Sequence, residues 1–199
     1  MLISLKNNIA VLAMTKTGST SIEAKLAPFC DMVFTQDPRV KHIQLKRFDR
    51  FFRPYLETLG FKDIETTCVF REPLDWLSSW YRYRQRDQLK GHPNSTAGLS
   101  FEEFVLNYLS DSPNPYAKVG RQSKFVTDKN GKVSIDHLFR YDEFQQYENF
   151  LSQRFGKKLS FEKLNVSPIA QIDLPSSTRS KLEQKLGTDF EIYEGLNRD

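Results

Sequence analysis

The sequence predicts an α/β fold with a mainly parallel sheet, because segments with the patterns of strands and of helices alternate along the chain. Two units carry this prediction. In each, a short apolar run leads through a polar turn into a helical pattern, first near residue 10 and again near residue 70. At 199 residues the chain is most simply one domain, spanning 1–199, and it is long enough for a sizeable core.

The expected elements follow from hydrophobic spacing and from residues that start or stop helices. The strands, short runs of apolar and β-branched residues, are expected at 8–13, 32–35, 65–70 and 137–141. The helices, which carry apolar residues three or four positions apart, are expected at 19–28, 44–59, 73–89, 101–109, 143–155, 176–186 and 188–195.

Local signals mark the ends of some elements and the turns between them. Pro73 suits the first turn of a helix, where its missing N–H leaves no hydrogen bond unmade. Ser100 and Glu103 have the spacing of a capping box that opens a helix at residue 101. Asn130-Gly131 predicts a hairpin over 126–133, and 91–98 is the strongest loop signal in the chain.

The first polar turn has the composition of an anion-binding loop, Thr15-Lys16-Thr17-Gly18-Ser19-Thr20-Ser21. The first N–H groups of the following helix lack partners, and the helix dipole adds partial positive charge, so a phosphate or sulfate is favoured there. Gly18 permits close backbone approach, and Lys16 supplies a mobile charge. Hydroxyl donors come from Thr17, Ser19, Thr20 and Ser21. The loop is not a Walker A motif, because its Lys precedes its Gly.

The second turn places an arginine at the end of an expected buried strand, 55 residues after Lys16. Arg71 is followed by Pro73 and, two turns into the next helix, by Ser79. An arginine presents a planar fork to phosphate oxygens, and a nearby hydroxyl can converge on the same group. The two turns together predict a site for a nucleotide that carries phosphates at two separate positions.

Both turns resemble motifs of the sulfotransferases that use 3′-phosphoadenosine 5′-phosphosulfate (PAPS). The first is similar to their 5′-phosphosulfate loop, Pro-Lys-Thr-Gly-Thr/Ser-Thr-Ser, with Thr15 in place of the proline. The second is similar to their 3′-phosphate motif, which would give that phosphate to Arg71 and Ser79, or to Ser78 if the helix is rotated. Gly120-Arg121-Gln122 extends the resemblance, which covers roughly residues 8–155. It implies a three-layer, P-loop-like sulfotransferase fold.

The resemblance also implies an activity, the transfer of a sulfuryl group from PAPS to a hydroxyl group of a carbohydrate or glycan. In that reaction Lys16 would neutralise the leaving 5′-phosphate, and the rest of the loop would hold the phosphosulfate. His42 is the first choice for the general base, since several carbohydrate sulfotransferases have a His in this interval. Glu57 and Glu102 are alternatives. The reaction needs no metal, and the sequence shows no metal-ligand cluster.

Charge is placed unevenly, with a formal net charge of +4 and local excesses of basic residues in 39–53 and 82–90. Such clusters attract anionic ligands. A nucleic-acid-binding module is one alternative, supported by aromatic residues that alternate with arginines over 80–84. Helical spacing makes these aromatics more typical of a core, and we expect no nucleic-acid partner. A kinase with a variant phosphate loop is another alternative, and it would require Mg-ATP.

The expected compartment is the cytoplasm. No apolar run reaches the roughly 18 residues that a membrane span requires, and Lys6-Asn7-Asn8 interrupts the start of the chain, unlike a signal peptide. Two cysteines, Cys30 and Cys68, are too few for a disulfide framework or a zinc site. The sequence leaves the oligomeric state open.

Overall fold

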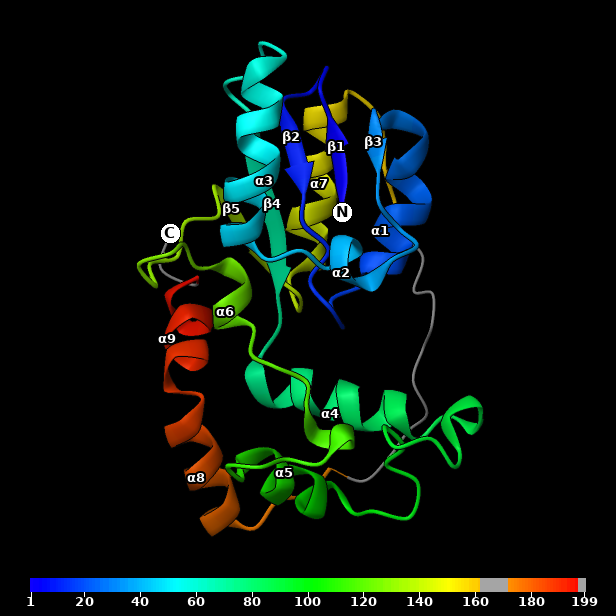
Figure 1. Cartoon of the computed structure of the whole chain (residues 1–199), viewed down its shortest axis with the longest axis vertical. Coiled ribbons are helices and arrows are strands. Elements are labelled where there is room, and N and C mark those ends of the chain that lie inside the picture. The colour runs from blue at the N-terminus through cyan, green and yellow to red at the C-terminus, as the bar shows by residue number, and fades with distance from the viewer. Residues whose placement is uncertain (162–171, 197–199) are drawn as a thin grey trace.

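A five-stranded sheet with helices on both faces forms one half of the molecule, and a group of helices forms the other (Figure 1). The structure is a computed structural model that describes residues 1–161 and 172–196. The strands are β1 (Leu2–Ser4), β2 (Ile9–Val11), β3 (Met32–Val33), β4 (Glu65–Phe70) and β5 (His137–Arg140). The α-helices are α1 (Ser19–Leu26), α2 (Pro38–Lys41), α3 (Leu45–Thr58), α4 (Pro73–Arg84), α5 (Phe101–Leu109), α6 (Ser123–Val126), α7 (Phe144–Phe155), α8 (Ser176–Lys185) and α9 (Gly187–Gly195). The predicted α/β class is therefore confirmed.

The sheet has the order β3-β1-β2-β4-β5. Strands β2, β4 and β5 are parallel neighbours, with Ile9 opposite Glu65 and Thr67 opposite His137. Strand β1 is antiparallel to both β2 and β3, so four of the strands described run in one direction and β1 runs in the other. Because β2 and β4 are parallel and adjacent, the turns that follow them lie side by side at one edge of the sheet.

Alternating side chains of the strands build a separate hydrophobic cluster on each face of the sheet. On one face, Val11 and Val69 pack with side chains of α1 and α7, including the fully buried Tyr147. On the other face, Ala10 and Cys68 pack with side chains of α3 and α6. The two clusters give the fold its three layers.

The helical half is built on α4, which begins directly after β4 and carries the chain away from the sheet (Figure 1). Trp76 and Tyr81 of α4 are buried against α5 and α8. The loop at 91–98 is anchored to this helix, because the buried Thr96 donates its hydroxyl to the carbonyl of Tyr81 at 2.8 Å. None of the helices in the described ranges is long and apolar enough to cross a membrane.

Several element boundaries differ from those predicted. Strand β1 was not expected, because it is only three residues long and is separated from β2 by a tight turn in which Asn8 has a φ of 49°. The first helix ends at Leu26 rather than at 28, where a 3₁₀ turn with Pro28 at its start takes over. The helix from Pro73 ends at Arg84, and a 3₁₀ turn at Asp87–Leu89 follows.

The predicted hairpin over 126–133 was wrong as a pair of strands. Only one bridge forms, between Thr127 and Val133. The turn itself is present, with Gly131 at a φ of 81°. Asp128 holds it by accepting hydrogen bonds from the backbone N–H groups of Asn130 and Lys132. These bonds add to two backbone bonds across the turn, from Asp128 to Lys132 at 2.8 Å and from Ser134 to Val126 at 3.2 Å.

Candidate anion-binding site

The polar loop between β2 and α1 has a backbone shaped for an anion. Lys16 and Gly18 both adopt left-handed torsions, with φ values of 65° and 78°. For Lys16 this conformation costs about 1–3 kcal/mol, and such strain is typical of functional sites. No hydrogen bond from the backbone N–H groups of residues 16–20 is found to any described residue. These open donors at the N-terminus of α1 form a cradle for a phosphate or sulfate.

The hydroxyl groups of the loop do not all serve this cradle. Thr17 is buried and donates its hydroxyl to the carbonyl of Met14 at 3.0 Å, so it holds the loop closed on itself. The expected role of Thr17 as a side-chain donor is therefore wrong, although its backbone N–H remains open. Ser19 and Ser21 are buried, whereas Thr20 is exposed at the start of α1.

Arg71 lies directly after β4 and contacts the loop. Its Nη1 donates to the carbonyl of Lys16 at 2.9 Å, and its Nε donates to Asp75 at 2.6 Å. The guanidinium also lies over the ring of Tyr141, 4.4 Å from the ring centre. The structure thus brings together the two motifs that the sequence separates by 55 residues.

Gln122 is a residue that the sequence marked only through the family resemblance. Its side chain is buried, accepts a hydrogen bond from the N–H of Arg71 at 3.0 Å and donates to the carbonyl of Arg71 at 2.7 Å. One amide side chain therefore satisfies both backbone groups of Arg71, as a neighbouring strand would. This clamp fixes the backbone from which the Arg71 guanidinium projects.

The two serines of α4 have different surroundings. Ser78 is fully buried, donates its hydroxyl to the carbonyl of Asp75 at 2.8 Å and accepts from Arg82 at 3.2 Å. Ser79 makes no side-chain hydrogen bond to any residue in 1–161 or 172–196. Because the hydroxyl of Ser78 is engaged, Ser79 is the better candidate for a ligand contact.

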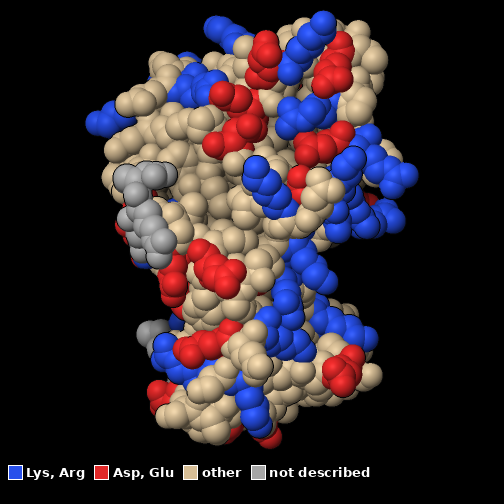
Figure 2. Space-filling model, turned by 90° about the vertical axis from the view of Figure 1, so that its left-hand side faces the viewer, with Lys and Arg blue, Asp and Glu red and all other residues tan. Residues whose placement is uncertain are grey.

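The side chain of Lys16 rests on aromatic rings of α4. Its Nζ lies 4.0 Å from the ring centre of Tyr83 and 5.6 Å from that of Trp80. Burial is the largest cause of a lowered pKa of Lys16, and the positive charges of Arg86, Arg71, Arg82 and Arg84 contribute in that order, so that the pKa falls to about 7. Figure 2 shows Lys and Arg side chains gathered where the molecule narrows between its two halves. An anion in the loop would relieve this repulsion.

His42 lies at the entrance of the same loop. Its Nδ1 is 2.6 Å from the carbonyl oxygen of Ala13, which lies two residues after the end of β2. A carbonyl can only accept, so Nδ1 carries the proton and Nε2 of the neutral ring is left to take one. Burial lowers the pKa of His42, which favours this neutral form.

The two carboxylates considered as alternative bases lie elsewhere. Glu57 is exposed near the end of α3, beside the segment that enters β4, whereas the loop follows the opposite ends of the strands. Glu102 lies in the first turn of α5 and accepts a hydrogen bond from Thr178 of α8 at 2.8 Å. The structure therefore places His42, and neither Glu57 nor Glu102, against the loop.

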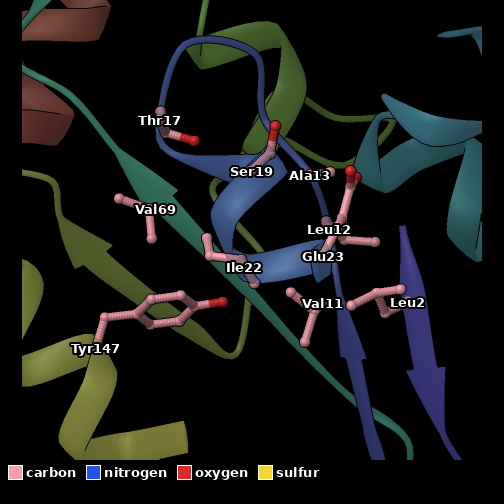
Figure 3. A pocket seen from close by; sticks show the side chains of 10 residues that line it. All are labelled: Leu2, Val11, Leu12, Ala13, Thr17, Ser19, Ile22, Glu23, Val69 and Tyr147. Atoms are coloured by element: carbon pink, nitrogen blue, oxygen red, sulfur yellow. The ribbon is translucent and has the colours of Figure 1, made fainter. Parts of the chain in front are cut away.

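A small cavity lies behind the loop, between α1, β2 and α7 (Figure 3). Its volume is about 10 Å³, and Thr17, Glu23 and Tyr147 are among the residues that line it. Figure 3 shows the ring of Tyr147 reaching toward it from α7. This space suits at most a single water molecule, so a nucleotide would have to bind on the open side of the loop.

The fold of the chain is shared with a sulfotransferase. The crystal structure of a sulfotransferase from Alicyclobacillus acidocaldarius superposes on it with a TM-score of 0.51 and 14% sequence identity, over 96% of each chain. No family model and no curated protein matches the sequence. The part of the chain that the structure describes contains no group of three or more His, Cys, Asp or Glu side chains that could hold a metal ion.

We predict that Lys16 titrates near pH 7 in the protein without ligand. Substituting Arg86→Gln should raise that pKa, because Arg86 is the positive charge that lowers it most. The measurement is a pH titration of the lysine side-chain carbons by NMR, with Lys16→Met to assign the signal. A Lys16 signal that titrates near the ordinary lysine value, about 10.4, would contradict the predicted environment.

Proposed function

We propose that the protein transfers a sulfuryl group from PAPS to a hydroxyl group of an acceptor. The observation that carries this proposal is the hydrogen bond from Arg71 to the carbonyl of Lys16, which holds two anion-binding groups together at the ends of β2 and β4. A mononucleotide with a single phosphate group would need only one of them. The shared fold with a sulfotransferase supports the same function.

The donor residues suggest which phosphate of the nucleotide each of the two groups would bind. The open N–H groups of residues 16–20 and the Lys16 ammonium would hold the 5′-phosphosulfate. Arg71 and Ser79 would hold the 3′-phosphate, with Gln122 keeping the backbone of Arg71 in place. PAPS would then bind across the narrow part of the molecule, where basic side chains gather (Figure 2).

Sulfuryl transfer requires in-line attack by the acceptor and stabilisation of the charge that develops on the leaving 5′-phosphate. Lys16 is suited to the second task, because a dianionic ligand would raise its lowered pKa and keep the ammonium charged. The loop N–H groups need no rearrangement to donate, which makes them preorganised for the same charge.

The acceptor hydroxyl needs a base, and we assign that role to His42. Its Nδ1–H is committed to Ala13, so Nε2 would accept the proton. The lowered pKa of His42 keeps the ring neutral, and therefore basic, at neutral pH. We further propose that the acceptor is a saccharide, that no metal takes part and that the protein works in the cytoplasm.

We predict that Arg71→Gln removes the preference of the protein for a 3′-phosphate. Calorimetric titration with 3′-phosphoadenosine 5′-phosphate (PAP) and with AMP should show PAP affinity falling about 10- to 100-fold toward that of AMP. Arg179→Gln, which removes an exposed charge from α8, is the matched control and should change neither affinity. If Arg71→Gln still preferred PAP over AMP, the 3′-phosphate would have to bind elsewhere.

We predict that His42→Asn lowers the transfer rate by about 10²- to 10⁴-fold, the usual contribution of a general base. Asparagine can still donate to the carbonyl of Ala13, so the loop and PAP affinity should be preserved. The assay follows labelled sulfate from PAPS to a panel of simple glycosides, with Glu57→Gln as the control. Full turnover by His42→Asn would show that another group is the base.

A further inference from the structure

A second cavity, of about 340 Å³, lies in the helical half of the molecule. Its walls come from the end of α5, the segment 117–121, the start of α6 and the end of α8. The volume falls within the range of small-molecule sites, roughly 300–1,000 Å³. It is much larger than the cavity behind the phosphate loop, and none of the proposed nucleotide contacts lines it.

The rim of this cavity is basic. Four cationic side chains line it, and the described lining contains no Asp or Glu. The four are Lys118, Arg121, Lys124 and Lys185. Lys118 and Lys124 are exposed, while Lys185 donates to the carbonyl of Leu109, the last residue of α5, at 2.7 Å. The carboxylate of Asp189, on α9, accepts hydrogen bonds from the backbone N–H and the hydroxyl of Ser123. The site therefore favours an anion.

The floor of the cavity is largely apolar. Tyr108 is buried, and its hydroxyl donates to the carbonyl of Gly120 at 2.9 Å. Pro113, Ala117 and Val119 complete this surface. A bare inorganic ion would leave the apolar floor uncovered, whereas a ring with charged substituents would cover it and reach the basic rim.

The cavity and the nucleotide site meet at one short segment but use different residues of it. Arg121 lines the cavity, whereas the next residue, Gln122, binds both backbone groups of Arg71. Consecutive Cα atoms are about 3.8 Å apart, so the two sites are neighbours.

We propose that this cavity is a second anion-binding site, separate from the nucleotide site, which takes a small organic polyanion whose acidic groups are carried on one or two rings. Its carboxylate or sulfate groups would pair with Lys118, Arg121 and Lys124, and a ring would pack on the floor at Tyr108. This inference goes beyond the proposed sulfuryl transfer and does not depend on it.

The test is calorimetric titration of the full chain, in the presence of saturating PAP, with a sulfated uronic-acid disaccharide and with lactose as the neutral probe. The acidic probe should bind and lactose should not. Lys118→Gln/Lys124→Gln should lower the affinity for the acidic probe about tenfold, as expected for the loss of two ion pairs. Lys129→Gln/Lys132→Gln, which removes the same charge from the exposed 127–133 turn, should leave its affinity unchanged.

If the two double variants weakened binding of the acidic probe equally, the loss would reflect net charge alone, and the proposed site would be wrong. Binding of the acidic probe that occurs without PAP and is lost in saturating PAP would also overturn it, because the cavity would then belong to the nucleotide site. Failure of PAP to bind at all would instead overturn the proposed function. The comparison of the two double variants would still test whether the cavity binds the acidic probe.

Discussion

The hydrogen bond between the Arg71 guanidinium and the backbone carbonyl of Lys16 is the contact on which the candidate site depends. It exists because β2 and β4 are adjacent and parallel, which places the turns after them at the same edge of the sheet. Gln122 then fixes the Arg71 backbone from the other side. The order of the strands thus brings two motifs that are distant in the sequence to one place in the fold.

Without a ligand, the site is held in an unfavourable electrostatic state. Burial is the largest cause that lowers the pKa of Lys16, and the positive charges of nearby arginines, Arg86 and Arg71 foremost, add to it, so the pKa falls to about 7. Lys16 also occupies a strained left-handed conformation. Both features cost stability in the folded protein and would be compensated by a polyanion, as expected where binding rather than folding has shaped the sequence.

The two strand-turn-helix units could be predicted from the sequence because each is local. A strand pattern, a Gly or Pro at a turn and a helix start lie within about a dozen residues, and their physical effects do not depend on the rest of the fold. The same holds for the capping box of Ser100 and Glu103, which the structure contains. Strand β1 escaped prediction because three residues carry too little periodicity.

Features that depend on tertiary contacts could not be predicted from local sequence patterns. The hydroxyl of Thr17 turns inward to Met14, and that of Ser78 bonds within α4, although both residue types suggest ligand donors. The double hydrogen bond of Gln122 to Arg71 joins residues 51 positions apart, and nothing in the local sequence around either residue signals it. Similarly, only the packing shows that His42, and not Glu57 or Glu102, lies against the loop.

The most direct test of the central claim is a calorimetric titration of the wild-type protein with PAP, AMP and Mg-ATP. Two separate phosphate sites predict tight binding of PAP without metal and much weaker binding of AMP, since only PAP reaches both the loop and Arg71. Binding of Mg-ATP in preference to PAP would contradict the account and favour a phosphoryl-transfer enzyme instead.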